Sequence, residues 1–197
     1  MAEQKVNPVR SSHGVLNRVF ARKRRSIHQS DKTAGHSASN GVKSTGCCEP
    51  FNPEPWQNKE ISWKDKIFVK DHITSFLHIP LNMGSKAVKN MKLIERANAK
   101  APYQLMLTDE KSLWGSDVYI DVSKNVPGAQ MTKLSGKFLT KVFEGPYQNA
   151  GKWAQEMKKY VESKDKDIKK LYFSYTTCPR CAKAYGKNYV VLFAQID

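Results

Sequence analysis

Long apolar runs are missing from this sequence. No stretch approaches the roughly 20 apolar residues that a membrane-spanning helix needs. The start of the chain also lacks the apolar segment that follows the basic residues of a secretory signal. We therefore expect a cytoplasmic protein. In such a reducing compartment, cysteines are interpreted as free thiols or metal ligands before disulfides.

Acidic residues are scarce beside basic ones: 33 Lys+Arg against 18 Asp+Glu give a net charge of +15. This excess favours acidic or anionic partners. No recognised nucleic-acid motif accompanies it, so nucleic acid is not an expected partner. Residues 1–45 are poor in aromatics and rich in Ser, Lys and Arg, which predicts a disordered basic tail before a folded domain over residues 46–197. An organelle transit peptide or a nuclear signal is the alternative interpretation of the tail.

Cysteine is also rare, and the four cysteines form two pairs. Cys47 and Cys48 are adjacent, whereas Cys178 and Cys181 frame a Cys-Pro-Arg-Cys turn between two strand-like runs. Such a turn resembles half of a zinc site, because it points two thiolates at one metal and structural zinc takes four ligands. The first pair could complete the set. The alternatives are a softer metal, a redox pair, or small buried side chains in a tight turn.

Histidines are few, and three of the five lie in the predicted tail: His13, His28 and His36. His72 or His78 could replace one cysteine as a zinc ligand. Either could also act as the base for a nucleophilic cysteine of the first pair.

The predicted folded domain repeats one order of elements. We expect strands at 67–69 and 73–79, a helix at 85–99, strands near 103–108 and 116–122, a hairpin of 131–134 and 137–144 around Gly136, a helix at 149–163, and strands at 170–176 and 189–196. Both halves therefore follow the order strand–helix–strand–strand. This order predicts an α+β domain with two main helices packed on an antiparallel sheet.

Short segments in the second half resemble a known fold family. Phe-Glu-Gly-Pro-Tyr at 143–147, Trp153 and Tyr-Thr-Thr-Cys-Pro at 175–179 resemble the GyrI-like effector-binding domains, which share a fold with the SOUL haem-binding proteins. The resemblance implies duplicated βαββ halves with a ligand cleft between them. The stretch from Lys59 to Gln195 is also similar to a group of bacterial proteins loosely called hydrolases.

The resemblance implies a small-molecule-binding protein, or a hydrolase that acts on a small apolar or aromatic compound. The side chains that would line its cleft are Tyr119, Tyr147, Trp153 and Tyr175. The alternative function is that of a thiol-based metal-binding or redox protein centred on the four cysteines.

The resemblance also implies a buried glutamate on or near the last strand. In this chain residues 187–196 contain no acid. Glu156, on the second helix, or Glu144, before the Gly-Pro-Tyr turn, could supply the general acid or base instead.

Overall fold

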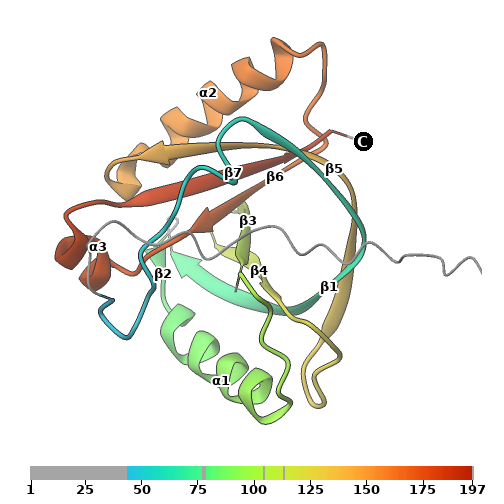
Figure 1. Cartoon of the computed structure of the whole chain (residues 1–197), viewed down its shortest axis with the longest axis vertical. Helices are drawn as coiled ribbons and strands as arrows, with labels where there is room; N and C mark the ends of the chain where they lie inside the picture. The colour runs from blue at the N-terminus through green and yellow to red at the C-terminus, as the bar shows by residue number, and fades with distance from the viewer. Residues whose placement is uncertain (1–43, 77–78, 104, 113, 197) are drawn as a thin grey trace, which may run out of the picture. The chain divides into compact units, whose positions relative to one another are not determined.

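Six antiparallel strands form a closed barrel in the computed structural model, which describes residues 44–76, 79–103, 105–112 and 114–196 (Figure 1). The strands are β1 (Lys59–Phe76), β3 (Met106–Ser112), β4 (Gly115–Asp121), β5 (Met131–Glu144), β6 (Lys170–Tyr175) and β7 (Tyr189–Gln195). Their neighbour order is β1-β4-β3-β6-β7-β5, and β5 pairs back with β1. A short strand, β2 (Ile79–Pro80), extends the sheet from β1. The predicted antiparallel α+β architecture is confirmed.

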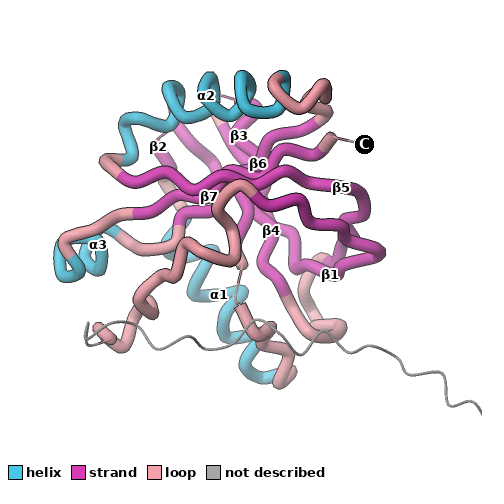
Figure 2. The backbone as a smooth tube through the Cα atoms, turned by 45° about the horizontal axis from the view of Figure 1, so that its top comes forward, coloured by secondary structure: helices cyan, strands magenta, loops and turns pink. Residues whose placement is uncertain are grey.

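Two long helices lie on the outside of the barrel, α1 (Met83–Arg96) and α2 (Ala150–Glu162) (Figure 2). On α2, Trp153, Met157 and Val161 recur at four-residue spacing and are buried, so one stripe of the helix faces the sheet. A single 3-10 turn, η1 (Tyr147–Asn149), leads into α2. Among the described residues, no helix combines the length and the apolar character that a membrane crossing requires.

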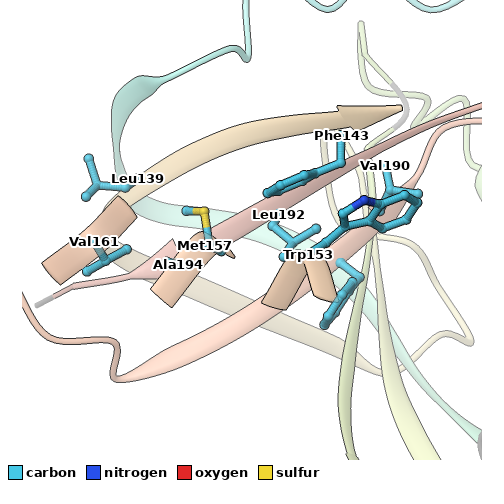
Figure 3. Packing of buried hydrophobic residues seen from close by; sticks show 9 residues of the cluster. Leu139, Phe143, Trp153, Met157, Val161, Val190, Leu192 and Ala194 are labelled. Atoms are coloured by element: carbon cyan, nitrogen blue, oxygen red, sulfur yellow. The ribbon is translucent and has the colours of Figure 1, made fainter. Parts of the chain in front are cut away.

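Buried side chains form three groups. The first lies between α2 and the sheet (Figure 3) and contains Leu139, Phe143, Trp153, Met157, Val161, Phe173, Val190, Leu192 and Ala194. The second draws on all six barrel strands and fills the barrel interior: Phe68, Leu105, Leu107, Tyr119, Phe138, Tyr172, Val191 and Phe193. The third lies beneath α1 and contains Val69, Ile73, Ile94, Ala99, Val118, Ile120, Val122 and Val126. The barrel is therefore packed with aromatic rings.

The first and fifth strands differ from the sequence-based prediction. The expected strands at 67–69 and 73–79 are parts of the single long strand β1, which starts at Lys59. The hairpin expected around Gly136 is wrong, because β5 runs through that residue. Gly136 has a φ of 132° and lies opposite Trp63, where the β1–β5 register shifts. Because a glycine tolerates this positive φ, the strand is distorted locally at residue 136 but continues without a turn.

The Cys-Pro-Arg-Cys segment is a short helix, not the tight turn that we expected. This helix, α3 (Pro179–Tyr185), starts with Pro179 at its first position, where a proline costs no hydrogen bond. Gly186, with a φ of 68°, ends it in the left-handed conformation that glycine favours. Cys178 precedes the helix and Cys181 lies in its first turn, so both thiols emerge from one end of α3.

Candidate metal centre

The four cysteines come together at one point of the structure. Their Sγ atoms all lie within 4.8 Å of one another. The Sγ of Cys47 is 3.9 Å from that of Cys48 and 3.9 Å from that of Cys178. The two cysteine pairs therefore meet, as the zinc alternative requires, although 130 residues separate Cys48 from Cys178.

The first pair is held in place by the N-terminal lead-in (residues 44–58), which packs on the barrel and on α3. The hydroxyl of Tyr185 donates to the carbonyl of Cys48, and the N–H of Thr45 donates to the Tyr185 oxygen at 3.0 Å. Further along, the hydroxyl of Thr140 donates to the carbonyl of Trp56 at 2.7 Å. The segment is thus attached at both ends, and the cysteines lie between these attachments.

Hydrogen bonds to sulfur and burial give the cysteines different thiol pKa values. The hydroxyl of Thr45 lies 3.1 Å from the Sγ of Cys181 and is the main reason why the pKa of Cys181 is lowered to about 7. Burial raises the pKa of Cys48 to about 12, although the N–H of Cys178 donates to its sulfur at 3.4 Å. The pKa of Cys47 is raised as well, chiefly through the thiol of Cys181. Four ionised thiolates so close together would repel one another, and a bound cation would offset that repulsion.

The sulfur positions fit a tetrahedral metal. In a zinc site with Zn–S bonds of about 2.3 Å, neighbouring sulfurs are about 3.8 Å apart. The two distances of 3.9 Å match this edge, and a small contraction would bring the remaining pairs, all within 4.8 Å, to the same value. A histidine ligand is not needed. His72 instead places its Nδ1 3.2 Å from Asp117, while His13, His28, His36 and His78 lie outside the described residues.

Two of the tyrosines proposed to line a cleft lie beside the cysteines. The hydroxyl of Tyr147 donates to the carbonyl of Thr177 at 2.7 Å, one residue before Cys178. Its ring meets that of Tyr175 at a centroid distance of 5.7 Å. The hydroxyl of Tyr175 donates to the carboxylate of Glu110 at 2.6 Å, and burial raises the pKa of Tyr175 strongly. Sequence reasoning missed Glu110, because no motif marks this position on β3.

The other proposed site residues are more dispersed. Trp153 is 4% exposed and stacks on Phe143 beneath α2, in the core against which Tyr147 and Tyr175 also pack. Tyr119 lies in the barrel interior instead. Glu156 is a half-buried residue of α2.

Glu144, the remaining proposed acid, is exposed at the end of β5. It borders a shallow depression together with Tyr189 and Gln57. Of the three glutamates, Glu110 is therefore the one that the structure joins to a predicted site tyrosine by a hydrogen bond.

Comparison with known proteins gives the family. The profile of a family described as "Bacterial hydrolase" matches residues 38–196. The chain belongs to this bacterial hydrolase family. The resemblance to bacterial hydrolases drawn from the sequence is thus confirmed, whereas no curated protein matches the chain.

Solved structures share the fold at low identity. A hydrolase from Listeria innocua is 11% identical, with a TM-score of 0.54, over 72% of this chain and 92% of that one. A second hydrolase from the same organism has a TM-score of 0.52 at the same identity and coverage. The EcmrR C-terminal domain has a TM-score of 0.51 at 11% identity, over 72% of this chain and 98% of that one. Likeness at this identity establishes the barrel fold alone.

Proposed function

We propose that the chain binds one zinc ion through Cys47, Cys48, Cys178 and Cys181, and that this ion has a structural role. The observation that carries the proposal is the convergence of all four Sγ atoms within 4.8 Å. Thiolates suit zinc and not the hard cations that prefer oxygen ligands. Four protein ligands fill a tetrahedral zinc and leave no position for a substrate or water.

The ion would fasten the lead-in to the barrel. The lead-in carries two aromatic anchors: Phe51 lies 5.7 Å from the ring of Tyr189, and Trp56 lies 5.4 Å from that of Phe193. A metal bridge between Cys48 and Cys178 joins this segment to α3 across the sequence. It would also hold the segment that contains Thr177, whose carbonyl accepts the Tyr147 hydrogen bond.

Metal analysis and cobalt substitution test the proposal. The protein purified without chelator should contain one zinc per chain, and Co²⁺ exchanged into it should give the visible absorption of a tetrahedral tetrathiolate site. The Cys181→Ser variant should lose tight binding. The matched control is Thr45→Val, which removes the hydroxyl beside Cys181 and keeps all four ligands.

The competing redox interpretation predicts a different result in the same experiment. A protein that takes up no zinc and forms a disulfide among these cysteines on mild oxidation would overturn the structural-zinc proposal. Thiols that become reactive only after the metal is chelated would support the structural-zinc proposal.

The second candidate function is hydrolysis or binding of a small apolar or aromatic compound, in a cleft between two βαββ halves. The specific observation in its favour is the partly buried pair of Tyr175 and Glu110 next to Tyr147. Glu110 would take the acid–base role assigned from the sequence to Glu144 or Glu156. The family description and the similar fold of two proteins named as hydrolases support this candidate.

Ligand screening tests this second candidate. Small aromatic compounds should raise the melting temperature of the full chain, and Glu110→Gln should weaken the effect. Glu156→Gln, a change of the same kind on α2, is the control. Equal responses of both variants would contradict the role of Glu110.

A further inference from the structure

Three of the large apolar side chains that remain exposed in the described structure gather where β1 ends and α1 begins. Leu81, Trp114 and Val88 are 67%, 60% and 55% exposed. The N–H of Leu81 donates to the carbonyl of Thr74 at 2.9 Å. The other side of the same peptide group, the N–H of Ser75, donates to the carbonyl of Trp114 at 2.9 Å. Because neighbouring strands lie about 4.8 Å apart, the backbones of Leu81 and Trp114 are about 10 Å apart.

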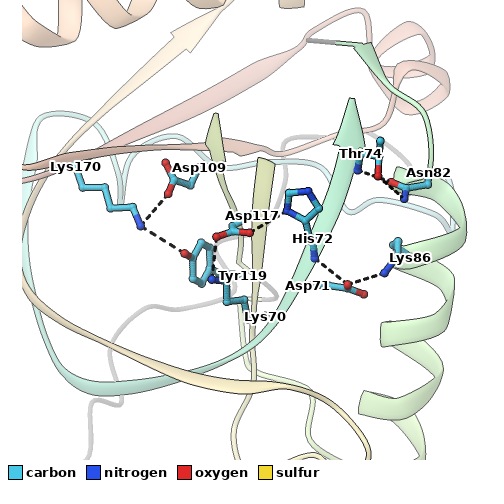
Figure 4. Close-up of polar contacts among 10 residues, drawn as sticks. All are labelled: Lys70, Asp71, His72, Thr74, Asn82, Lys86, Asp109, Asp117, Tyr119 and Lys170. Carbon is cyan, nitrogen blue, oxygen red and sulfur yellow. Dashed lines mark hydrogen bonds and ion pairs between the residues drawn. The ribbon is translucent and has the colours of Figure 1, made fainter. Parts of the chain in front are cut away.

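The attachment of α1 to β1 decides which side of the helix faces solvent. The ammonium of Lys86 lies 2.8 Å from Asp71 of β1 (Figure 4), and the amide of Asn90 donates to the same carboxylate at 2.8 Å. Val88 and Lys92 are each two residues from Asn90, and two residues correspond to about 200° around a helix. Both side chains therefore point away from the barrel, and both are exposed.

The outer side of α1 is basic. Lys89, Lys92 and Arg96 are exposed, and in the described part of the chain no acid forms an ion pair with them. Glu95, the acid on this side of the helix, pairs with Lys100 at 3.0 Å instead. Exposed apolar side chains and unpaired cations thus lie side by side. We call this surface the α1 corner, and it consists of Leu81, Val88, Lys89, Lys92 and Trp114.

We propose that the α1 corner docks the protein on the surface of an anionic lipid bilayer. Exposed apolar side chains next to basic ones are the combination by which peripheral proteins bind membranes. Leu81 and Val88 would enter the acyl boundary, and the indole of Trp114 suits the headgroup level, where tryptophan is enriched. Lys89 and Lys92 would lie near the anionic headgroups.

Charge and apolar surface together select this partner. The net charge of +15 adds attraction to an anionic surface. A nucleic acid would engage the cations but would gain little from Leu81 and Val88, so these aliphatic side chains favour lipid. The docking uses none of the proposed zinc ligands, and it therefore stands or falls independently of the metal centre.

Vesicle sedimentation with the full, metal-loaded chain tests the docking. Vesicles of phosphatidylcholine and phosphatidylserine in equal amounts should bind the chain, and vesicles of phosphatidylcholine alone should bind it much more weakly. The double variant Lys89→Gln, Lys92→Gln should bind the anionic vesicles about 25-fold more weakly, since each lysine near such a surface contributes about fivefold. The control variant Lys152→Gln, Lys159→Gln removes the same charge from exposed positions of α2 and should change binding by less than about threefold. Equal losses in the two double variants, or equal binding to both kinds of vesicle, would overturn the proposal.

Insertion of the apolar side chains has a readout of its own. Trp114 is 60% exposed, whereas the other tryptophans pack on neighbouring rings: Trp56, Trp63 and Trp153. Anionic vesicles should therefore shift the tryptophan emission to shorter wavelength, and Trp114→Phe should remove this shift at an unchanged melting temperature. Val88→Ser should weaken vesicle binding about fivefold or more, because one apolar side chain no longer leaves water on docking. Unchanged binding of Val88→Ser, or a shift that survives in Trp114→Phe, would indicate adsorption by charge alone and overturn the proposal.

Discussion

Removal of the metal should lower the thermal stability of the chain by a large amount. Zinc links Cys48 to Cys178, which lie 130 residues apart in the sequence, so the complete site exists in the folded chain alone. An ion that binds only the folded state stabilises it by about 4 kcal/mol when its free concentration is roughly 1,000 times its dissociation constant. For a domain of ~150 residues, each kcal/mol corresponds to roughly 2–4 °C in melting temperature. We therefore expect a fall of about 8–16 °C when zinc at that free concentration is removed completely.

The assay is thermal unfolding followed by circular dichroism, at fixed free zinc and again after chelation. Fixed free metal matters because a ligand that binds only the folded state makes the melting temperature depend on its concentration. Cys181→Ser should melt near the temperature of the chelated protein, and Thr45→Val should stay near the zinc-bound one. If metal analysis proves that zinc has left and the melting temperature falls by less than about 3 °C, the claim that zinc stabilises the fold is refuted.

Three further predictions concern the barrel and its helices. Trp153→Ala removes a 4% exposed ring that stacks on Phe143. Urea titration should show a loss of about 3–5 kcal/mol in unfolding free energy, and a loss below about 1 kcal/mol would contradict the core role of Trp153. In Gly115→Ala, the new Cβ would lie 2.7 Å from Nε2 of His72, so the ring must move. The NMR chemical shifts of the His72 ring should change as its contact with Asp117 is lost, and unchanged ring shifts would argue against the contact. Burial raises the pKa of Asp71, but hydrogen bonds from Lys86 and Asn90 outweigh this effect, and the pKa lies below its usual value. The folded-state pKa is thus below the unfolded one, so this contribution to stability is complete above about pH 4 and is lost as the pH falls through the folded pKa. Asp71→Asn should lose less unfolding free energy than the parent between about pH 5 and pH 2, and equal losses would contradict the assignment.

The fold was predictable where a periodic pattern is local. The helix over Ala150–Glu162 follows from its apolar stripe, and β6 and β7 follow from short apolar runs bounded by polar residues. The long strands were harder to predict. In β5, Gly136 suggests a turn, and only pairing with β1 shows that the strand continues. Closure of the barrel depends on this β1–β5 pairing of distant segments, which no local pattern encodes.

The candidate metal site was predictable in its residues but not in its geometry. Rare cysteines in two pairs indicated the four ligands, and the fold brings them within 4.8 Å. The short helix that presents Cys181 was missed, since seven residues are too few for a periodic signal. Glu110 was missed for a different reason. It is one charged residue on a strand, and its proposed role depends on a partner from another strand, Tyr175.

X-ray absorption at the zinc edge tests the central claim most directly. The account predicts one zinc per chain with a first shell of four sulfurs at about 2.3 Å and no oxygen or nitrogen ligand. A shell in which oxygen or nitrogen replaces sulfur, or a protein that binds no zinc with all four cysteines reduced, would contradict it.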